Sequence, residues 1–437
     1  MKYDVVVIGS GFGGLACAHL LSKAGRSVLV LESHWQSGGC LQSYQRKGHT
    51  FDTGLHYVGG LREGETLHDI FCTLDLLRLP WHQLDVDGTD LITIDGETFC
   101  LAQGFDHFVE VLATQFPDQR EALKSYVDML QGPDPDPSVN AWQWLNEHFS
   151  NQLLIDVLSG SCLKTELCRE SLPLLAFAHS QKSYIQSSWR LKGDSSLIVR
   201  SLVDDIRNMG GEVICRAEVE ELIEQDGSIV AALCSNGERY EGSYFISDIH
   251  PVQTFALVKE SKVVKRIFRT RLSMLKNTYG MYTYSLVLKP QTLPYFNHNK
   301  FVYAGGSVWD EATQKVMLSC RVPEDGSEYA TLLDLLTPCE VNPMELAESV
   351  VPGLHDMVVQ QYISTPHTWQ RFTHTPDGSA YGIRKDCRQP LLTMLSPRTP
   401  ISNLLLTGQN VMLHGLEGVA MTAQQTTEII LNNETSK

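Results

Sequence analysis

The sequence predicts an α/β fold in which a parallel-sheet domain is assembled from three separated segments and a second domain is inserted between them. Three observations support this fold. The chain opens with a strand, a glycine turn and a helix, and the same texture returns near residues 193 and 403. The two intervening segments have a different pattern, and 437 residues exceed one ordinary core. We therefore assign residues 1–62, 189–250 and 391–437 to the first domain and 63–188 and 251–390 to the second.

The first segment follows a βαβ pattern. Val5 to Ile8 form a continuous apolar run of the buried parallel-strand type, and Leu15, Ala18 and Leu21 recur at helical spacing. A second strand is expected at 27–32, after the Ala24-Gly25 breaker.

Periodicity and helix-breaking residues also predict the remaining elements. Residues 63–184 read as mixed helices and loops, and the proline-rich stretch 132–137 must be a loop. An amphipathic helix ending at Gly210-Gly211 precedes a strand at 212–215. The other expected strands are 219–223, 229–234 and 240–246 as a meander, 281–288, 316–320 and 330–335 in an antiparallel sheet, and 404–406 before a final helix.

Composition excludes several classes of protein. Hydrophobic residues make up 43%, so a sizeable core is expected and wholesale disorder is not. The 51 acidic residues outnumber 35 basic ones, and the net charge of −16 makes nucleic acid an improbable partner.

Cysteine usage and apolar runs bear on location. Eleven cysteines lack a CxxC pair or zinc spacing, which predicts a reducing cytoplasm, no disulfides and no metal. No signal peptide is visible, and no run approaches the roughly 20 apolar residues that span a bilayer. We expect at most peripheral membrane contact.

The motif Gly9-Ser10-Gly11-Phe12-Gly13-Gly14 carries the first chemical signal. It fits GxGxxG, follows a predicted strand and opens a predicted helix, and Glu32 closes the next strand. Gly9 permits the tight turn, Gly11 lets the backbone approach a pyrophosphate, and Gly14 allows close helix packing. Glu32 would accept hydrogen bonds from a ribose. The pattern predicts a Rossmann-like dinucleotide site, against the alternative of a merely glycine-rich turn.

Two further segments suggest which dinucleotide binds. A second glycine pair, Gly38-Gly39, follows Glu32, and the run from Phe51 to Gly60 contains Asp52-x-Gly54-x-His56. With the terminal Thr407-Gly408-Gln409-Asn410 and His414-Gly415, these motifs resemble the FAD-binding fold shared by amine oxidases, phytoene desaturases and carotenoid isomerases. The retinol saturase and carotenoid isomerase branch of the phytoene desaturase-like flavoproteins is the most similar. The resemblance covers about a third of the chain.

The resemblance implies FAD as cofactor and hydride exchange between the flavin and carbon–carbon bonds of a hydrophobic polyene or isoprenoid, as a saturase, desaturase or isomerase. An electron donor or acceptor is implied but not identified. Val219 would meet the adenine, and Glu417, Gly418 and Val419 would begin the helix that faces the flavin pyrimidine. The cofactor contacts implied are Gly9, Ser10, Gly11, Phe12, Gly13, Gly14, Glu32, Ser33, Gly38, Gly39, Cys40, Gly54, Leu55, His56, Val219, Gly408, Gln409, Glu417, Gly418 and Val419.

Several residues keep two interpretations. His56, Tyr57 and His414 are candidate catalytic proton donors or hydrogen-bonded structural residues. Cys40 is a flavin-adjacent, even covalently attached, thiol or a small apolar residue. Aromatic residues of the insertions line a polyene tunnel or fill the core: Trp142, Trp144, Trp189, Tyr279, Tyr282, Tyr284 and Trp369.

Two rival functions stay open on the same fold. One is a flavin amine oxidase, which would favour an aromatic pair facing the flavin. The other is a non-catalytic carrier of prenyl or lipid groups, which predicts an eroded dinucleotide site. The intact glycines and Glu32 argue against the carrier.

Overall fold

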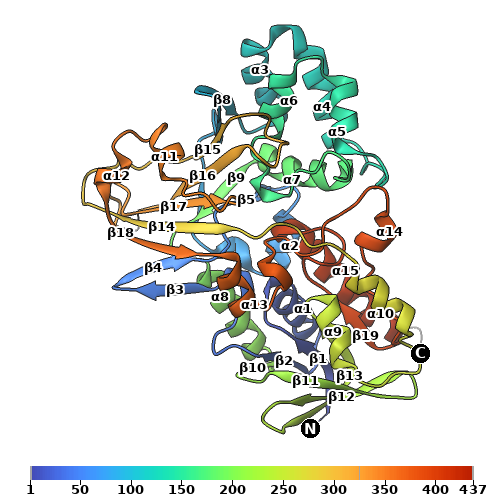
Figure 1. Cartoon of the computed structure of the whole chain (residues 1–437). Coiled ribbons are helices and arrows are strands. Elements are labelled where there is room, and N and C mark those ends of the chain that lie inside the picture. Colours follow the sequence, from blue (N-terminus) through green and yellow to red (C-terminus); the bar gives the residue numbers. More distant parts are fainter. Residues whose placement is uncertain (1, 324, 436–437) are drawn as a thin grey trace.

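The computed structural model describes residues 2–323 and 325–435, with side chains described through residue 432. Residues 1, 324, 436 and 437 of the predicted domains lie outside this description. Two seven-stranded sheets organise the molecule, and a group of helices caps the second sheet at the top of Figure 1.

The first sheet combines strands from all three predicted segments. Its centre, β10-β2-β1-β13, is parallel and is extended by β19, whereas β11 and β12 add an antiparallel edge. Val5, Val6 and Val7 of the central strand are fully buried, as a parallel strand covered on both faces requires. The strands are β1 (Lys2–Ile8), β2 (Val28–Glu32), β10 (Glu212–Cys215), β11 (Val219–Gln225), β12 (Ser228–Cys234), β13 (Arg239–Ser247) and β19 (Leu404–Leu406).

Three helices pack on one face of this sheet around a shared apolar core. The core joins Leu15 to Ile198 and Ala423, which come from three separate segments. The helices are α1 (Phe12–Lys23), α8 (Ser196–Asn208) and α15 (Gly415–Thr435). The last helix begins at Gly415, three positions before the predicted start near Gly418, because Gly415 adopts a positive φ of 75° that suits a glycine.

The second sheet belongs to the two inserted segments. Five of its six strand pairs are antiparallel, in agreement with the predicted antiparallel sheet, and β7 pairs with β15 in parallel. The strands are β7 (Asp90–Ile94), β8 (Glu97–Leu101), β14 (Tyr282–Leu288), β15 (Asn299–Ala304), β16 (Gln314–Cys320), β17 (Leu332–Thr337) and β18 (Val358–Ser364).

Two smaller sheets, one of two strands and one of three, accompany the two seven-stranded sheets. Residues 63–184 contain several strands, although we predicted only helices and loops there. The strands were missed because runs such as 81–83 are too short and polar to show the alternation of a strand. A polar hairpin at 43–52 was missed for the same reason. These strands are β3 (Ser43–Arg46), β4 (His49–Asp52), β5 (Val58–Gly59), β6 (Trp81–Gln83) and β9 (Ser188–Leu191).

The remaining helices lie over the second sheet or connect strands. Residues 132–137 form the expected loop after α4. In the described part of the chain, no helix combines the length and the apolar composition needed to cross a membrane. The helices are α2 (His68–Thr73), α3 (Phe105–Gln115), α4 (Arg120–Gln131), α5 (Ala141–His148), α6 (Gln152–Ser159), α7 (Leu174–Gln186), α9 (Pro251–Leu257), α10 (Arg266–Ser273), α11 (Met344–Glu348), α12 (Leu354–Met357), α13 (Pro366–Thr373) and α14 (Pro390–Thr393).

Candidate functional site

The glycine loop between β1 and α1 is built for close backbone approach. Gly9 has a φ of +93°, which allows the chain to turn out of the sheet, and its N–H donates to the Leu31 carbonyl at 2.9 Å. Gly11 is the N-cap of α1 and has no side chain to satisfy the free N–H groups of the first turn. The loop therefore presents backbone donors and the positive end of a helix dipole.

Glu32 organises this loop from the end of β2. One carboxylate oxygen accepts hydrogen bonds from the Ser10 backbone N–H (3.0 Å) and hydroxyl (2.5 Å). The other accepts from the His34 N–H at 2.7 Å. Glu32 is thus a loop-positioning residue as well as a lining residue of the cavity described below.

Asp248 lies against the glycine loop and was not predicted as a site residue. A β-carbon on Gly11 or on Gly13 would lie 2.5 Å from a carboxylate oxygen of Asp248. Burial and the charge of Glu32 raise the pKa of Asp248 to about 7, although a hydrogen bond from the Gly14 N–H opposes the shift. The available signal was its place just after β13, since β13 neighbours β1 in parallel and the carboxyl ends of such strands meet at one edge.

A cavity of about 300 Å³ extends from the glycine loop into the second domain. Its inner end is apolar and includes Met281, Leu336, Ala380 and Tyr381. Fifteen of the twenty predicted cofactor contacts line it: Gly9, Ser10, Gly11, Phe12, Gly13, Glu32, Ser33, Gly38, Gly39, Cys40, Gly54, His56, Gly408, Gln409 and Val419.

Five predicted cofactor contacts are not among the residues that line this cavity. Gly14 instead packs against Gly9, and Leu55 lines a neighbouring polar cavity. Val219 begins β11 at the antiparallel edge of the first sheet. Glu417 and Gly418 face a second small cavity on the other side of the first turn of α15, whereas Gly415 and Leu416 take the places predicted for them.

The cavity has the chemistry that an FAD would need. Several glycines leave room for a pyrophosphate, the loop offers backbone donors, and the inner end is apolar enough for a flavin ring and a hydrophobic substrate. Asp248 is the one anionic group that an incoming pyrophosphate would meet at the loop besides Glu32, among the lining residues that the structure describes.

His56 is the predicted catalytic residue that reaches this cavity. Burial lowers its pKa to about 4 despite the opposing charge of Asp52, so the imidazole is neutral near pH 7. Its Nε2 has no hydrogen-bond partner in the described part of the chain. His56 also borders a small polar cavity that contains Asp52, Arg190 and Arg321.

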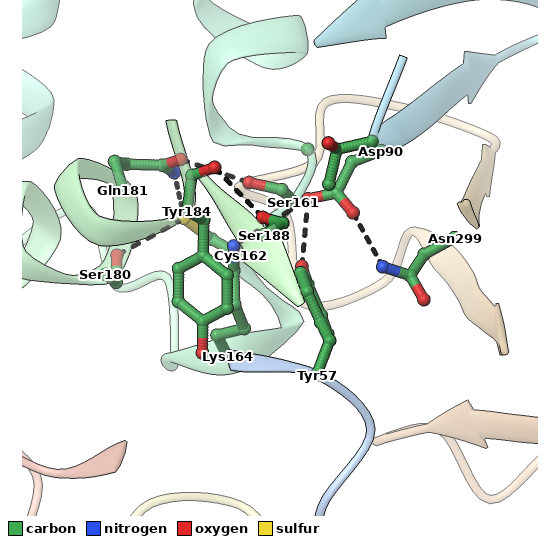
Figure 2. A network of polar contacts seen from close by, with 12 residues as sticks. Tyr57, Asp90, Ser161, Cys162, Lys164, Ser180, Gln181, Tyr184, Ser188 and Asn299 are labelled. Carbon is green, nitrogen blue, oxygen red and sulfur yellow. Dashed lines mark hydrogen bonds and ion pairs between the residues drawn. The ribbon is translucent and has the colours of Figure 1, made fainter. Parts of the chain in front are cut away.

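Tyr57 is not among the residues that line the cavity, and Figure 2 shows its hydroxyl directed at Asp90. Its hydroxyl donates to Asp90 at 2.9 Å, and Asp90 also accepts from Asn299 at 2.9 Å. Burial and this carboxylate raise the pKa of Tyr57 well above its ordinary value. The side chain is therefore placed as a structural hydrogen-bond donor, not at the cofactor cavity.

His414 is also set back from the cavity. Its Nε2–H donates to the Lys164 carbonyl at 3.2 Å, and its ring lies against Tyr381 with centroids 5.0 Å apart. Burial lowers its pKa to about 4. Tyr381 lines the cavity, so His414 reaches the cavity only through that ring.

The thiol and aromatic candidates divide in the same way. Burial raises the pKa of Cys40 to about 11, so its thiol lines the cavity in the unreactive protonated form. Trp369 lines the cavity, and Phe372 and Tyr381 do so without having been predicted. The other aromatic candidates are absent from the lining: Trp142, Trp144, Trp189, Tyr279, Tyr282 and Tyr284.

Comparison with known proteins agrees with this geometry. Residues 7–74 match the model of an NAD(P)-binding Rossmann-like domain. All-trans-retinol 13,14-reductase from Rattus norvegicus is 25% identical over 98% of this chain and 86% of its own length. Prolycopene isomerase 1 from an Oncidium hybrid cultivar is 22% identical over 94% and 80%. The chain is a homologue of these reductases and isomerases.

Several solved structures have the same fold as this chain. An oxidoreductase from Methanosarcina mazei superposes with a TM-score of 0.70 at 16% identity, covering 98% of this chain and 100% of its own. Wild-type putrescine oxidase bound to putrescine gives 0.68 at 16% identity, covering 99% of both. These likenesses concern the fold alone, which is the predicted α/β architecture.

Proposed function

We propose that this homologue is an FAD-dependent oxidoreductase that exchanges a hydride with carbon–carbon bonds of a hydrophobic polyene. The observation that carries the proposal is the near full-length similarity to two proteins whose named substrates, retinol and prolycopene, are both polyenes. A cavity that runs from a glycine loop to an apolar inner end supports it. The direction of the reaction is left to experiment.

The residues of the cavity would divide the work of holding FAD. The N–H groups at the start of α1 would bind the pyrophosphate, and Glu32 would accept from the ribose. The first turn of α15 would present Gly415, Leu416 and Val419 to the flavin. Bound FAD would supply the hydride chemistry, and the apolar lining would exclude water from it.

His56 is the residue of the cavity best placed to hold a proton near the substrate. It lies at the boundary between the cavity and the charged group Asp52, Arg190 and Arg321. A neutral imidazole can donate its ring N–H or accept a proton, as hydride exchange with a double bond requires.

Reconstitution with FAD tests the proposal directly. The purified protein is loaded with FAD, reduced anaerobically with dithionite and mixed with all-trans-retinol or prolycopene. We expect the flavin absorbance to return as the polyene is reduced, or the polyene to isomerise. His56→Ala should retain FAD and slow this step about 10²–10⁴-fold if it transfers the proton.

The same experiment separates the rival functions. Reduction of oxidised flavin by putrescine, with no reaction of the polyenes, would assign the protein to the amine oxidases. Retinoid binding by a protein that never takes up FAD would assign it to the carriers. Either result would overturn the proposal.

We also propose a cytoplasmic location with at most peripheral membrane contact. The support is the eleven cysteines, none of which is paired with another. Fractionation of the producing cells, with and without a high-salt wash of the membranes, tests this location. The fraction that contains the protein is also the one in which its electron donor or acceptor should be sought.

A further inference from the structure

A second, smaller cavity of about 40 Å³ lies beside the first turn of α15. Three buried polar atoms at its wall have no hydrogen-bond partner among the described residues: Lys164 Nζ, His414 Nδ1 and Glu417 Oε2. Unpaired buried polar atoms are costly, and a cavity of this size admits a water molecule. The site is therefore built for a small polar occupant.

A chain of ion pairs links this cavity to solvent. Glu417 Oε1 lies 2.9 Å from His179 Nδ1, and His179 Nε2 lies 3.0 Å from Asp134 Oδ1. The exposed fraction of the side chains rises along this series of ion pairs, from 9% for Glu417 and 12% for His179 to 60% for Asp134. The three residues come from α15, α7 and the loop after α4.

The inner side of the cavity adjoins the cofactor cavity. Both cavities share Gly415 and Leu416, so only the first turn of α15 separates them. At the wall of the small cavity, the Lys164 ammonium lies 3.7 Å from the centre of the Tyr184 ring and 3.8 Å from Asp90 Oδ2 (Figure 2). Lys164 and Asp90 thus form a second buried cation–carboxylate pair, of which Lys164 lines the small cavity.

We propose that Asp134, His179 and Glu417 form a proton path between solvent and the reaction site, completed by a water molecule in the small cavity. The proposal rests on the proposed function, because hydride exchange with a double bond moves one proton at the neighbouring carbon. For reduction, the imidazolium of His179 gives its Nδ1 proton to Glu417, and Glu417 releases a proton through the water molecule to replace the one that the substrate carbon takes up. The neutral ring of His179 keeps its Nε2–H, turns to place that N–H toward Glu417, and takes a new proton from solvent, through Asp134, on the nitrogen that then faces Asp134. Its charge is restored after each passage, and the electrons come from the reduced flavin.

The protonation state of His179 agrees with this role. Burial alone would lower its pKa, but the hydrogen bonds and charges of Asp134 and Glu417 outweigh burial and raise it to about 9. The imidazolium that can pass a proton inward is therefore the resting form at neutral pH. Lys182 is a further charged group beside Asp134, and Lys164 lines the same small cavity as His179 and Glu417.

Substitution of the path tests the proposal, with a histidine–aspartate pair elsewhere as control. The variants are His179→Gln and Glu417→Gln. The control is His107→Gln, because His107 Nε2 pairs with Asp87 at 2.9 Å on the surface of α3. FAD absorbance first establishes that each variant folds and binds cofactor.

Rates are then measured in H₂O and D₂O. We expect His179→Gln and Glu417→Gln to slow single turnover with all-trans-retinol at least tenfold and to raise the solvent isotope effect, while His107→Gln changes neither. Added imidazole should restore the rate of His179→Ala, which a purely structural role would not explain. Unchanged rates and isotope effects in FAD-loaded His179→Gln would overturn the path.

Two measurements need no polyene and separate this proposal from the proposed function. Reduction of bound FAD by dithionite takes up a proton, so its solvent isotope effect should respond to the same variants. In histidine-labelled protein, NMR should show an imidazolium that persists to about pH 9 and that His179→Gln removes. If the wild type binds FAD but converts no polyene, the proposed function fails, and these two readouts still decide the path.

Discussion

At the scale of single residues, Asp248 provides a second reason why the motif requires glycines. Because Gly11 was predicted to let the backbone approach a pyrophosphate, a β-carbon there was expected to intrude on that group. The structure places the carboxylate of Asp248 2.5 Å from that position, so the first clash is with the protein itself. The glycines are needed to admit Asp248 as well as a cofactor.

Gly11→Ala should therefore lower FAD affinity at least tenfold, because the new β-carbon would overlap the Asp248 carboxylate, which accepts a hydrogen bond from the Gly14 N–H. Gly11→Ala combined with Asp248→Ala should recover part of the affinity, since the second change removes the clashing atoms. Equilibrium dialysis with FAD measures both. If the double variant recovers no FAD affinity, the β-carbon clashes with the cofactor and not with Asp248, as originally predicted.

The pKa of Asp248 predicts a pH dependence. In the cofactor-free protein the carboxyl keeps its proton up to about pH 7, whereas in the unfolded chain it ionises near 3.8. The folded state then binds more protons, so stability should fall as the pH rises from about 4 to about 7 and level off above. FAD affinity should fall above pH 7, where an ionised Asp248 faces the pyrophosphate.

Asp248→Asn should remove both dependences. Urea unfolding between pH 4 and 8 and FAD titrations on either side of pH 7 provide the measurements. Equal slopes in the wild type and the variant would show that other groups set the pH response.

At the scale of elements, the start of α15 depends on the preceding loop. A β-carbon at Gly418 would lie 2.6 Å from the backbone carbonyl carbon and oxygen of Leu413. Because the resemblance implied that Gly418 helps begin the helix that faces the flavin pyrimidine, a bulky residue here was expected to damage the flavin site directly. The structure instead indicates that the helix start itself would be displaced.

Gly418→Val should consequently destabilise the protein by about 1–3 kcal/mol even without FAD. Met421→Val on the same helix is the matched control, because Met421 is 38% exposed and the change also introduces a β-branched residue. Chemical unfolding of the cofactor-free proteins compares the two. A loss confined to FAD affinity in Gly418→Val would favour the original prediction.

At the scale of the whole molecule, the network around Asp90 ties the sheets together. Tyr57 precedes β5 of the small sheet, Asp90 begins β7 of the large sheet, and Asn299 begins β15 beside it. Arg190 of β9 donates to Asn299 at 2.7 Å and extends the network to the strand beside β5. These contacts fix the inserted domain relative to the segment that carries His56.

Tyr57→Phe should cost about 1–3 kcal/mol of unfolding free energy, because a buried carboxylate loses a donor, and FAD should stay bound. Tyr282→Phe on β14 is the control, since that side chain is only partly buried in the apolar cluster of the second sheet. Urea denaturation and flavin absorbance give the two readouts. A variant of normal stability but slow turnover would instead restore Tyr57 to the catalytic residues.

The sequence predicted the elements whose evidence is local. The run Val5 to Ile8, the GxGxxG loop and the helix that contains Ile198 each show their periodicity within a few turns, and the structure confirms them. Tyr57 and His414, for which a structural role was also open, do not line the cavity, because neighbouring positions such as His56 and Tyr57 face different sides of the chain. Asp248 was missed because its importance depends on the parallel pairing of β1 and β13, which no local pattern contains.

The distance along the chain between α1 and the elements that complete its packing has a consequence for biosynthesis. The Cys17 thiol contacts the Thr407 hydroxyl across 390 positions, and β19 and α15 close the same core. A ribosome must release this late segment before the cavity has its Gly408 wall and the first turn of α15. The proposed binding of FAD by the complete cavity therefore requires this late segment, and the nascent chain exposes an unfinished sheet edge at β13 until the segment is available.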